Sequence, residues 1–123
     1  MKRILIADDK PNGRELVRTI LENDGYEVFE AADGQQAVER ARQLHPDLVI
    51  LDLHMPILDG FGAVEALRKE AEFNRTPVMA LTASAMMGDR ERALGAGFTG
   101  YCTKPIRLSA LRAEVQRLLS FAQ

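Results

Sequence analysis

The sequence predicts an α/β fold: a single doubly wound (βα)5 domain built on a parallel five-stranded sheet of order 2-1-3-4-5. Three runs of almost purely apolar residues, 4–7, 48–51 and 78–81, have the length and the Ile, Leu and Val content of strands buried on both faces. Two more polar runs, 27–31 and 100–103, are typical of edge strands. A helical pattern follows each run, so every connection crosses the sheet and the strands are parallel. Placing the apolar runs centrally gives the order 2-1-3-4-5, one of the two common doubly wound orders.

The composition fits one domain over residues 1–123. The chain is 46% hydrophobic and carries a formal charge of −2, from 16 basic and 18 acidic residues. A domain of this length buries enough surface to fold without disulfides, and the lone Cys102 favours a reducing, cytoplasmic location. The small negative charge argues against direct nucleic-acid binding. No apolar run approaches the ~20 residues that span a membrane.

The first two helices carry start and stop signals. The first is predicted over about 11–24, because Pro11 suits a first turn and Gly25 suits the left-handed residue after a helix. Its inward stripe is predicted to contain Leu16, Val17, Ile20 and Leu21. The second is predicted over about 34–44, where Asp33 resembles an N-cap and Gln36 completes a capping box.

Three further helices are predicted from their amphipathic patterns, over about 61–71, 85–96 and 108–121. The third of these has the clearest apolar stripe: Leu111, Val115, Leu118 and Leu119.

Polar residues stand where four of the strands end. Asp8 and Asp9 follow the first strand, Asp52 the third, Thr82 the fourth and Lys104 the fifth. In such a sheet, ligands bind at the carboxyl ends of the strands, where the strand order reverses between strands one and three. Each residue alone fits a turn, a cap or a solvated side chain. Their joint occurrence at corresponding strand ends favours a functional site.

The chemistry of this set indicates a divalent cation and a phosphoryl group. Two carboxylates ~4 Å apart repel by about 4 kcal/mol at an effective dielectric near 20, and a hard cation relieves that repulsion. Mg²⁺ prefers oxygen ligands and keeps waters that phosphate oxygens can replace. A threonine hydroxyl (Thr82) and a lysine ammonium (Lys104) suit a phosphoryl group. Asp52 could act as the nucleophile, forming an aspartyl phosphate.

Other motifs carry less information. Residues 95–100 satisfy G-x-G-x-x-G, but they close a helix and open a strand, so they are interpreted as a C-cap and turn rather than a dinucleotide site. His45 and His54 lack partners at metal-ligand spacing. Met86 and Met87 fit a partner surface or ordinary packing equally well.

Four stretches together resemble a known family. They are Ile4-Leu5-Ile6-Ala7-Asp8-Asp9, Asp52-Leu53-His54-Met55-Pro56-Ile57-Leu58-Asp59-Gly60, Leu81-Thr82-Ala83 and Lys104-Pro105. Over essentially its whole length the chain resembles the receiver domain of bacterial response regulators, the CheY-like group of two-component signalling, which has a flavodoxin-like fold.

The resemblance implies a role for each site residue. Asp52 would be the phosphoacceptor. Asp9 and Asp52 would bind Mg²⁺ directly and Asp8 through water, with the main-chain carbonyl of His54 as a further ligand and with Mn²⁺ as a substitute metal. The side chains that contact the phosphoryl oxygens would be Thr82 and Lys104.

The resemblance also implies the means of signalling. Thr82 and Tyr101 would be switch residues, and the Lys104–Pro105 peptide bond would be cis, aiming the lysine into the crevice. One departure is Arg107, which stands where relatives often have a helix-capping residue.

The implied function is a phosphorylation switch of a phosphorelay, not a turnover enzyme. Its phosphodonor would be a sensor histidine kinase or a phosphotransfer protein. A downstream partner protein or effector domain would bind the face formed by the fourth helix, fifth strand and fifth helix. Neither nucleic acid nor a membrane is expected as a direct partner.

Three alternative functions share part of this pattern. An aspartyl-phosphate hydrolase usually needs an Asp where this chain has His54. A flavin-binding module needs a phosphate-binding loop, and 8–11 (Asp-Asp-Lys-Pro) is a poor cradle for a dianion. A degenerate receiver would act as a protein-interaction module without phosphorylation, but the acidic residues, the threonine and the lysine are all intact.

Overall fold

The strands form the sheet that the sequence predicts. The computed structural model describes residues 1–83 and 88–121. Within them, five parallel strands lie in the order β2-β1-β3-β4-β5. Each strand begins and ends within one residue of its predicted range: β1 (Arg3–Ala7), β2 (Glu27–Ala31), β3 (Leu48–Asp52), β4 (Val78–Thr82) and β5 (Gly100–Thr103).

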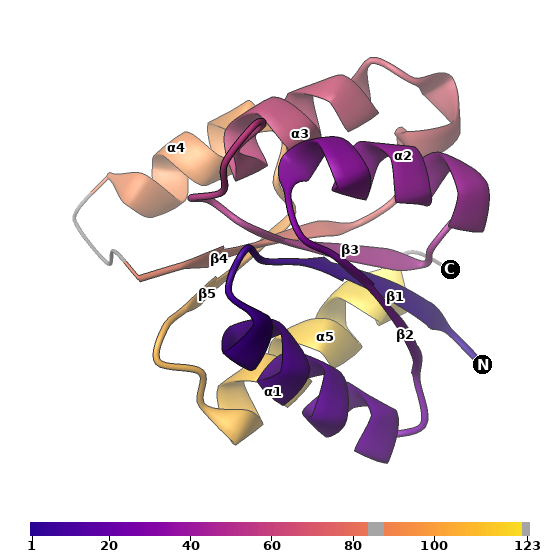
Figure 1. The fold of residues 1–123 in the computed structure, drawn as a ribbon, viewed down its shortest axis with the longest axis vertical. Helices are drawn as coiled ribbons and strands as arrows, with labels where there is room; N and C mark the ends of the chain where they lie inside the picture. Colours follow the sequence, from indigo (N-terminus) through magenta and orange to yellow (C-terminus); the bar gives the residue numbers. More distant parts are fainter. Residues whose placement is uncertain (84–87, 122–123) are drawn as a thin grey trace.

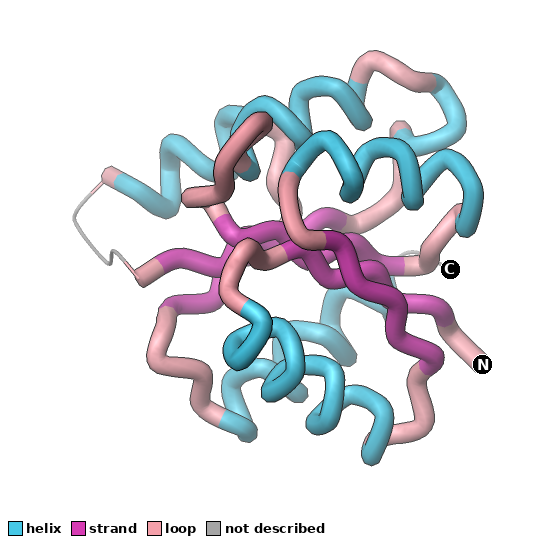
Figure 2. The backbone as a smooth tube through the Cα atoms, viewed as in Figure 1, coloured by secondary structure: helices cyan, strands magenta, loops and turns pink. Residues whose placement is uncertain are grey.

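Helices cover both faces of this sheet (Figures 1 and 2). One face carries α2 (Gly34–Leu44), α3 (Gly60–Arg68) and α4 (Asp89–Ala96), and the other carries α1 (Pro11–Asn23) and α5 (Leu108–Phe121). The predicted first turn of α4, at 85–88, and the Met86-Met87 pair fall largely outside the described residues. No helix in the described part of the chain is long and apolar enough to cross a membrane.

The core has two apolar layers, one on each side of the sheet. Because side chains alternate along a strand, β1 sends Ile4 and Ile6 toward α1 and α5, and Leu5 and Ala7 toward the other three helices. Strands β3 and β4 are buried along their whole length. The three apolar runs are therefore the central strands, as predicted. The site lies at the carboxyl ends of these buried strands.

One predicted helix is too long. The pattern predicted a helix to residue 71, but α3 ends at Arg68, and a separate 3-10 turn, η1 (Ala71–Phe73), buries Phe73. The helix cannot continue, because the backbone at Glu70 is extended, with φ −100° and ψ 125°. At the same place the Arg68 guanidinium donates to the carbonyls of Phe73 at 2.6 Å, Thr76 at 2.7 Å and Gly97 at 3.0 Å. Burial lowers the pKa of Arg68. These bonds fix the chain that leads from α3 into β4.

Two smaller predictions also need correction. Leu16, predicted in the inward stripe of α1, is 49% exposed, because Val17 and Leu21 already fill the contact with the sheet. Asp33 caps α2 by accepting from the Gln36 main-chain N–H at 2.8 Å. The Gln36 side chain, however, accepts from the N–H of Ala32 rather than that of the N-cap residue, so the capping box is displaced by one residue.

Candidate metal and phosphoryl site

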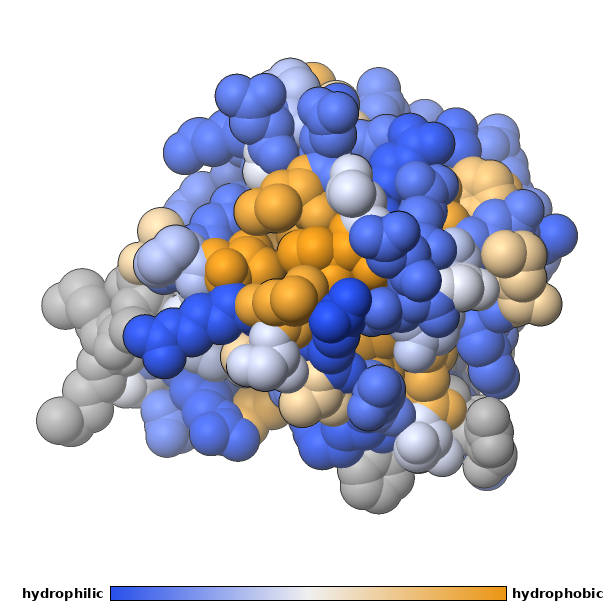
Figure 3. All heavy atoms as spheres, turned by 90° about the horizontal axis from the view of Figure 1, so that it is seen from below, coloured by the Kyte–Doolittle hydropathy of each residue, from blue (hydrophilic) through white to orange (hydrophobic). Residues whose placement is uncertain are grey.

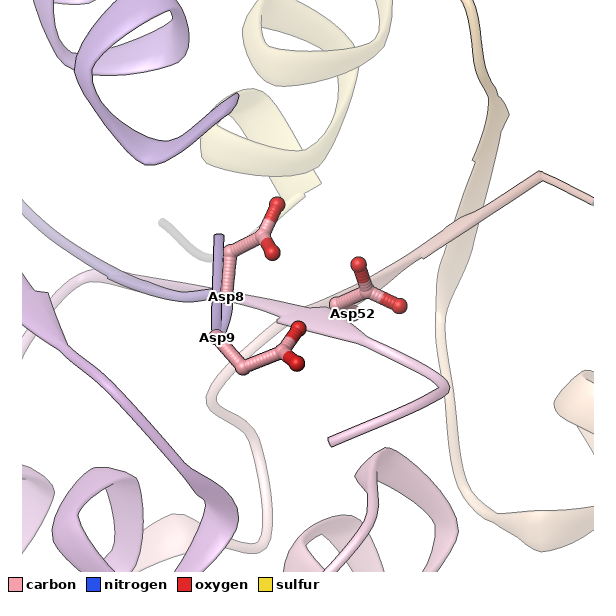
Figure 4. Close-up of side chains that lie close together, drawn as sticks. All are labelled: Asp8, Asp9 and Asp52. Atoms are coloured by element: carbon pink, nitrogen blue, oxygen red, sulfur yellow. The ribbon is translucent and has the colours of Figure 1, made fainter. Parts of the chain in front are cut away.

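The carboxyl edge of the sheet brings three carboxylates together. In the β1–β3 pairing Ala7 lies beside Leu51, so the next residues, Asp8 and Asp52, also lie side by side. With Asp9 they offer carboxylate oxygens that all lie within 4.8 Å of one another (Figure 4). Asp8 and Asp52 are 1% and 5% exposed, whereas Asp9 is exposed. Oxygen atoms are the donors that Mg²⁺ prefers, so the residues present fit this cation.

Lys104 reaches into the same crevice from the loop after β5. Its Nζ lies 3.0 Å from Oδ2 of Asp8 and 2.5 Å from Oδ2 of Asp52. Burial acts to lower the pKa of Lys104, but its hydrogen bonds to the two carboxylates outweigh that effect and raise the pKa. The ammonium therefore stays charged at neutral pH and neutralises part of the acidic cluster. The Lys104–Pro105 peptide bond is cis.

Main-chain N–H groups hold the other oxygens of the two buried carboxylates. Oδ1 of Asp8 accepts from the N–H of Lys10 at 2.9 Å, and Oδ1 of Asp52 accepts from the N–H of His54 at 2.9 Å. The His54 side chain itself is exposed. Because each buried carboxylate is held at one oxygen by its own loop, the rotamers that face the crevice are fixed before any ligand binds.

A glycine lets α3 begin close to Asp52. A Cβ on Gly60 would lie 2.5 Å from the main-chain oxygen of Asp52 and 2.9 Å from Cα of Leu53. The Gly60 N–H also donates to the carbonyl of Leu53 at 3.2 Å. The sequence motif contains this glycine without revealing its role, which is to permit this close approach of the backbone.

The loop between β3 and α3 contains a strained residue. Ile57 has a φ of 70°, in the left-handed region that a β-branched residue rarely adopts, and its side chain is exposed. The N–H of Leu58 donates to the carbonyl of Pro56 at 2.7 Å across it, which closes a tight turn.

Thr82 and Tyr101 lie on one face of the sheet. Tyr101 is the register partner of Ala80, and Thr82 lies two residues further along β4, so both side chains point toward α4. Thr82 is buried and borders a cavity of about 120 Å³, which Phe61 and Arg92 also line. Tyr101 is half-buried, and burial raises its pKa.

The fold and the site together define an α/β domain with an acidic crevice at its strand ends, equipped with a buried threonine and a lysine. Residues 4–116 match the family model described as the response regulator receiver domain. The chain belongs to this family.

Similar proteins agree with that assignment. The polar-differentiation response regulator DivK of Brucella ovis is 36% identical over 121 residues, which cover 98% of each chain. A probable transcriptional regulator, ycf27, of Porphyridium aerugineum is 39% identical over 96% of this chain, but the match spans only 48% of that protein. This chain thus covers about half the length of some of the relatives it matches.

A solved structure extends the comparison to three dimensions. The receiver domain of the sensor histidine kinase PA1611 from Pseudomonas aeruginosa, solved with a magnesium ion coordinated in its active-site cleft, superposes with a TM-score of 0.90 at 36% identity. The alignment covers 97% of this chain and 98% of that one.

Proposed function

We propose that this receiver domain is a phosphorylation switch in which Asp52 accepts a phosphoryl group from a phosphohistidine while Asp8, Asp9 and Asp52 hold Mg²⁺. The observation that carries the proposal is the convergence of these carboxylates with the Lys104 ammonium at the carboxyl ends of the strands. The magnesium ion in the cleft of the PA1611 receiver supports the choice of cation. We include the His54 carbonyl among the proposed ligands, because the His54 N–H already ties that residue to Asp52.

The proposed step transfers a phosphoryl group without any change in oxidation state. A carboxylate oxygen of Asp52 forms a bond to phosphorus, the P–N bond of the phosphohistidine breaks, and its electron pair returns to the imidazole. Mg²⁺, or Mn²⁺ in its place, would neutralise charge on the phosphoryl oxygens. Lys104 is placed to move from the carboxylates to a phosphoryl oxygen, and Thr82 would donate its hydroxyl to another. The domain would thus be modified once per signal and not act as a turnover enzyme.

The phosphodonor is proposed to dock on an apolar groove beside the acidic cluster. The groove has a volume of about 570 Å³, and Asp8, Asp9 and Lys104 are among the residues that line it. Its apolar lining consists of Pro11, Leu16, Val17, Leu81, Pro105 and Ile106. Figure 3 shows apolar side chains gathered on the face where α1 and α5 lie. Because a phosphohistidine must come within bonding distance of Asp52, a histidine kinase or phosphotransfer protein would contact this groove.

The output is proposed to leave through α4, β5 and α5. A phosphoryl group on Asp52 would draw the Thr82 hydroxyl toward it and change the cavity behind that side chain. Tyr101 lies on the same face and borders a groove of about 400 Å³ with Arg90, Glu114 and Arg117. A downstream partner protein or effector domain would bind there. A cytoplasmic location fits the free thiol of Cys102.

Intact-mass spectrometry with acetyl phosphate as donor tests the proposal. The wild-type protein should gain one phosphoryl group in Mg²⁺ and none in excess EDTA, and Asp52→Asn should gain none. Asp59→Asn is a matched control, because Asp59 is an exposed carboxylate that caps α3 and lies outside the crevice. If wild type and Asp52→Asn gain phosphate equally, or if neither gains any, the proposal is wrong. The second result would favour a receiver that acts only through protein contacts.

A further inference from the structure

The loop that carries Asp8 and Asp9 has an anchor outside the acidic crevice. This loop, residues 8–10, joins β1 to α1. No described side chain caps the N-terminus of α1, where Lys10 is the N-cap residue. The bond between the Asp8 carboxylate and the N–H of Lys10 fixes the side chain of Asp8, but it does not fix the direction of the peptide group that follows.

Arg14 supplies that missing constraint. Its Nη1 donates to the main-chain carbonyl of Asp8 at 2.7 Å, and its Nε donates to Oε1 of Glu30 at 2.9 Å. The carbonyl oxygen of Asp8 and the N–H of Asp9 belong to one planar peptide group. Holding the oxygen therefore fixes the orientation of the backbone from which the Asp9 carboxylate projects.

The partner of Arg14 is itself held in place. Glu30 lies near the carboxyl end of the edge strand β2, and its second oxygen accepts from Arg18 Nη1 at 2.6 Å. Burial acts to raise the pKa of Glu30, but the hydrogen bonds from Arg18 and Arg14 outweigh it and lower the pKa. Glu30 thus stays ionised at neutral pH. The side chains of Arg14 and Glu30 are 18% and 27% exposed.

We infer that Arg14, clamped by Glu30, is a positioning residue that orients the β1–α1 loop for Mg²⁺ binding. The inference rests on the proposed function, because it assumes that Asp8 and Asp9 bind the cation. Arg14 would not contact the metal or the phosphoryl group. It would act only through the Asp8 carbonyl, as the partners that orient metal ligands do, and losing such partners commonly weakens metal binding by about 10- to 100-fold.

The sign of the effect separates positioning from simple charge. Arg14 is a cation near a cation site, so if it acted only by charge, removing it would tighten Mg²⁺ binding. Positioning predicts the opposite. Arg18 is the matched control, since it lies one turn further along α1 and binds the same carboxylate of Glu30, while its ion pairs are with Glu22 and Glu30 and not with the β1–α1 loop.

Titration of ¹⁵N-labelled protein with MgCl₂, followed by amide chemical shifts, measures the affinity for Mg²⁺. The same spectra show whether each variant is folded. Arg14→Met should bind Mg²⁺ at least about tenfold more weakly than wild type. Arg14→Lys should also bind more weakly, because an ammonium lacks the fork that reaches both acceptors. Arg18→Met should bind as wild type does, or slightly more tightly. Thermal melts in EDTA record the effect of each change on the fold alone.

Two results would overturn the inference: Arg14→Met binding as tightly as Arg18→Met, or Arg14→Lys binding like wild type. Asp9→Ala separates this failure from failure of the site itself. If wild type shows no saturable Mg²⁺ binding, or if Asp9→Ala binds equally well, the proposed Mg²⁺ site is wrong and the inference about Arg14 is wrong with it.

Discussion

Lys104 is predicted to compete with Mg²⁺ for the same carboxylates, so removing it should have opposite effects without and with the metal. In metal-free protein its ammonium bridges Asp8 and Asp52, which are both buried. Removing one partner of a buried ion pair costs about 3–5 kcal/mol. The Lys104 side chain is 21% exposed, so water can partly replace it, and we expect Lys104→Met to lower the free energy of unfolding by about 2–3 kcal/mol in EDTA.

Mg²⁺ should reverse much of this loss. Without the competing ammonium, we expect the two carboxylates to bind Mg²⁺ more tightly than in wild type. A tenfold lower Kd adds about 1.4 kcal/mol of stability at saturating metal. Urea unfolding followed by circular dichroism, in EDTA and in Mg²⁺, measures both effects.

Lys10→Met is the matched control, because Lys10 lies in the same loop and carries the same charge on an exposed side chain. If Lys104→Met is as stable as Lys10→Met in EDTA, or if its stabilisation by Mg²⁺ is no greater than that of wild type, the bridging role of Lys104 is refuted.

Three further predictions test the surroundings of the site. Arg68→Met should lower the free energy of unfolding by about 2–4 kcal/mol, since three main-chain carbonyls lose a charged donor; a loss no larger than that of the exposed Arg75→Met in urea unfolding would contradict this. Ile57→Gly should raise the melting temperature by about 2–4 °C. A left-handed conformation costs a residue with a Cβ about 1–2 kcal/mol, and Gly avoids this cost but loses more conformational entropy on folding, so the net gain is smaller. A lower melting temperature for Ile57→Gly would contradict this prediction. Hydrogen bonding from Arg117 lowers the pKa of Glu114 below its ordinary 4.5, so the stability that this carboxylate contributes is present above pH 4.5 and is lost as the pH falls through the lower, folded-state pKa. The difference in melting temperature between wild type and Glu114→Gln should therefore shrink below pH 4.5. A difference independent of pH would count against a stabilising ion pair between Glu114 and Arg117.

The sheet could be predicted because strands buried on both faces consist almost entirely of apolar residues, which the sequence shows directly. Runs such as 48–51 are apolar at every position, as a central parallel strand requires because both of its faces are buried. The convergence of Asp8 and Asp52 then follows from topology, since neighbouring parallel strands end at the same edge. Each of these steps depends on local pattern and on general rules of connection.

The features that the sequence could not predict depend on contacts between distant residues. At the end of α3, Arg68 binds carbonyls that lie up to 29 positions further along the chain. The anchor formed by Arg14 and Glu30 joins a helix to an edge strand, and no spacing rule connects those positions. The half-exposed Leu16 shows the same limit, because the apolar pattern of a helix does not show how many of its apolar residues the sheet can bury.

The most direct test of the central claim asks whether a phosphoryl group at Asp52 changes the surface of α4, β5 and α5. Beryllofluoride mimics the phosphoryl group, and amide chemical shifts in Mg²⁺ report its effect on each residue. We predict large shifts at Asp9 and Asp52 that extend through Thr82 to Tyr101 and α4, and in Thr82→Ala the shifts should remain near Asp52 but fade at Tyr101. Shifts that stay confined to the loops around Asp9 and Asp52 in the wild-type protein would contradict the account.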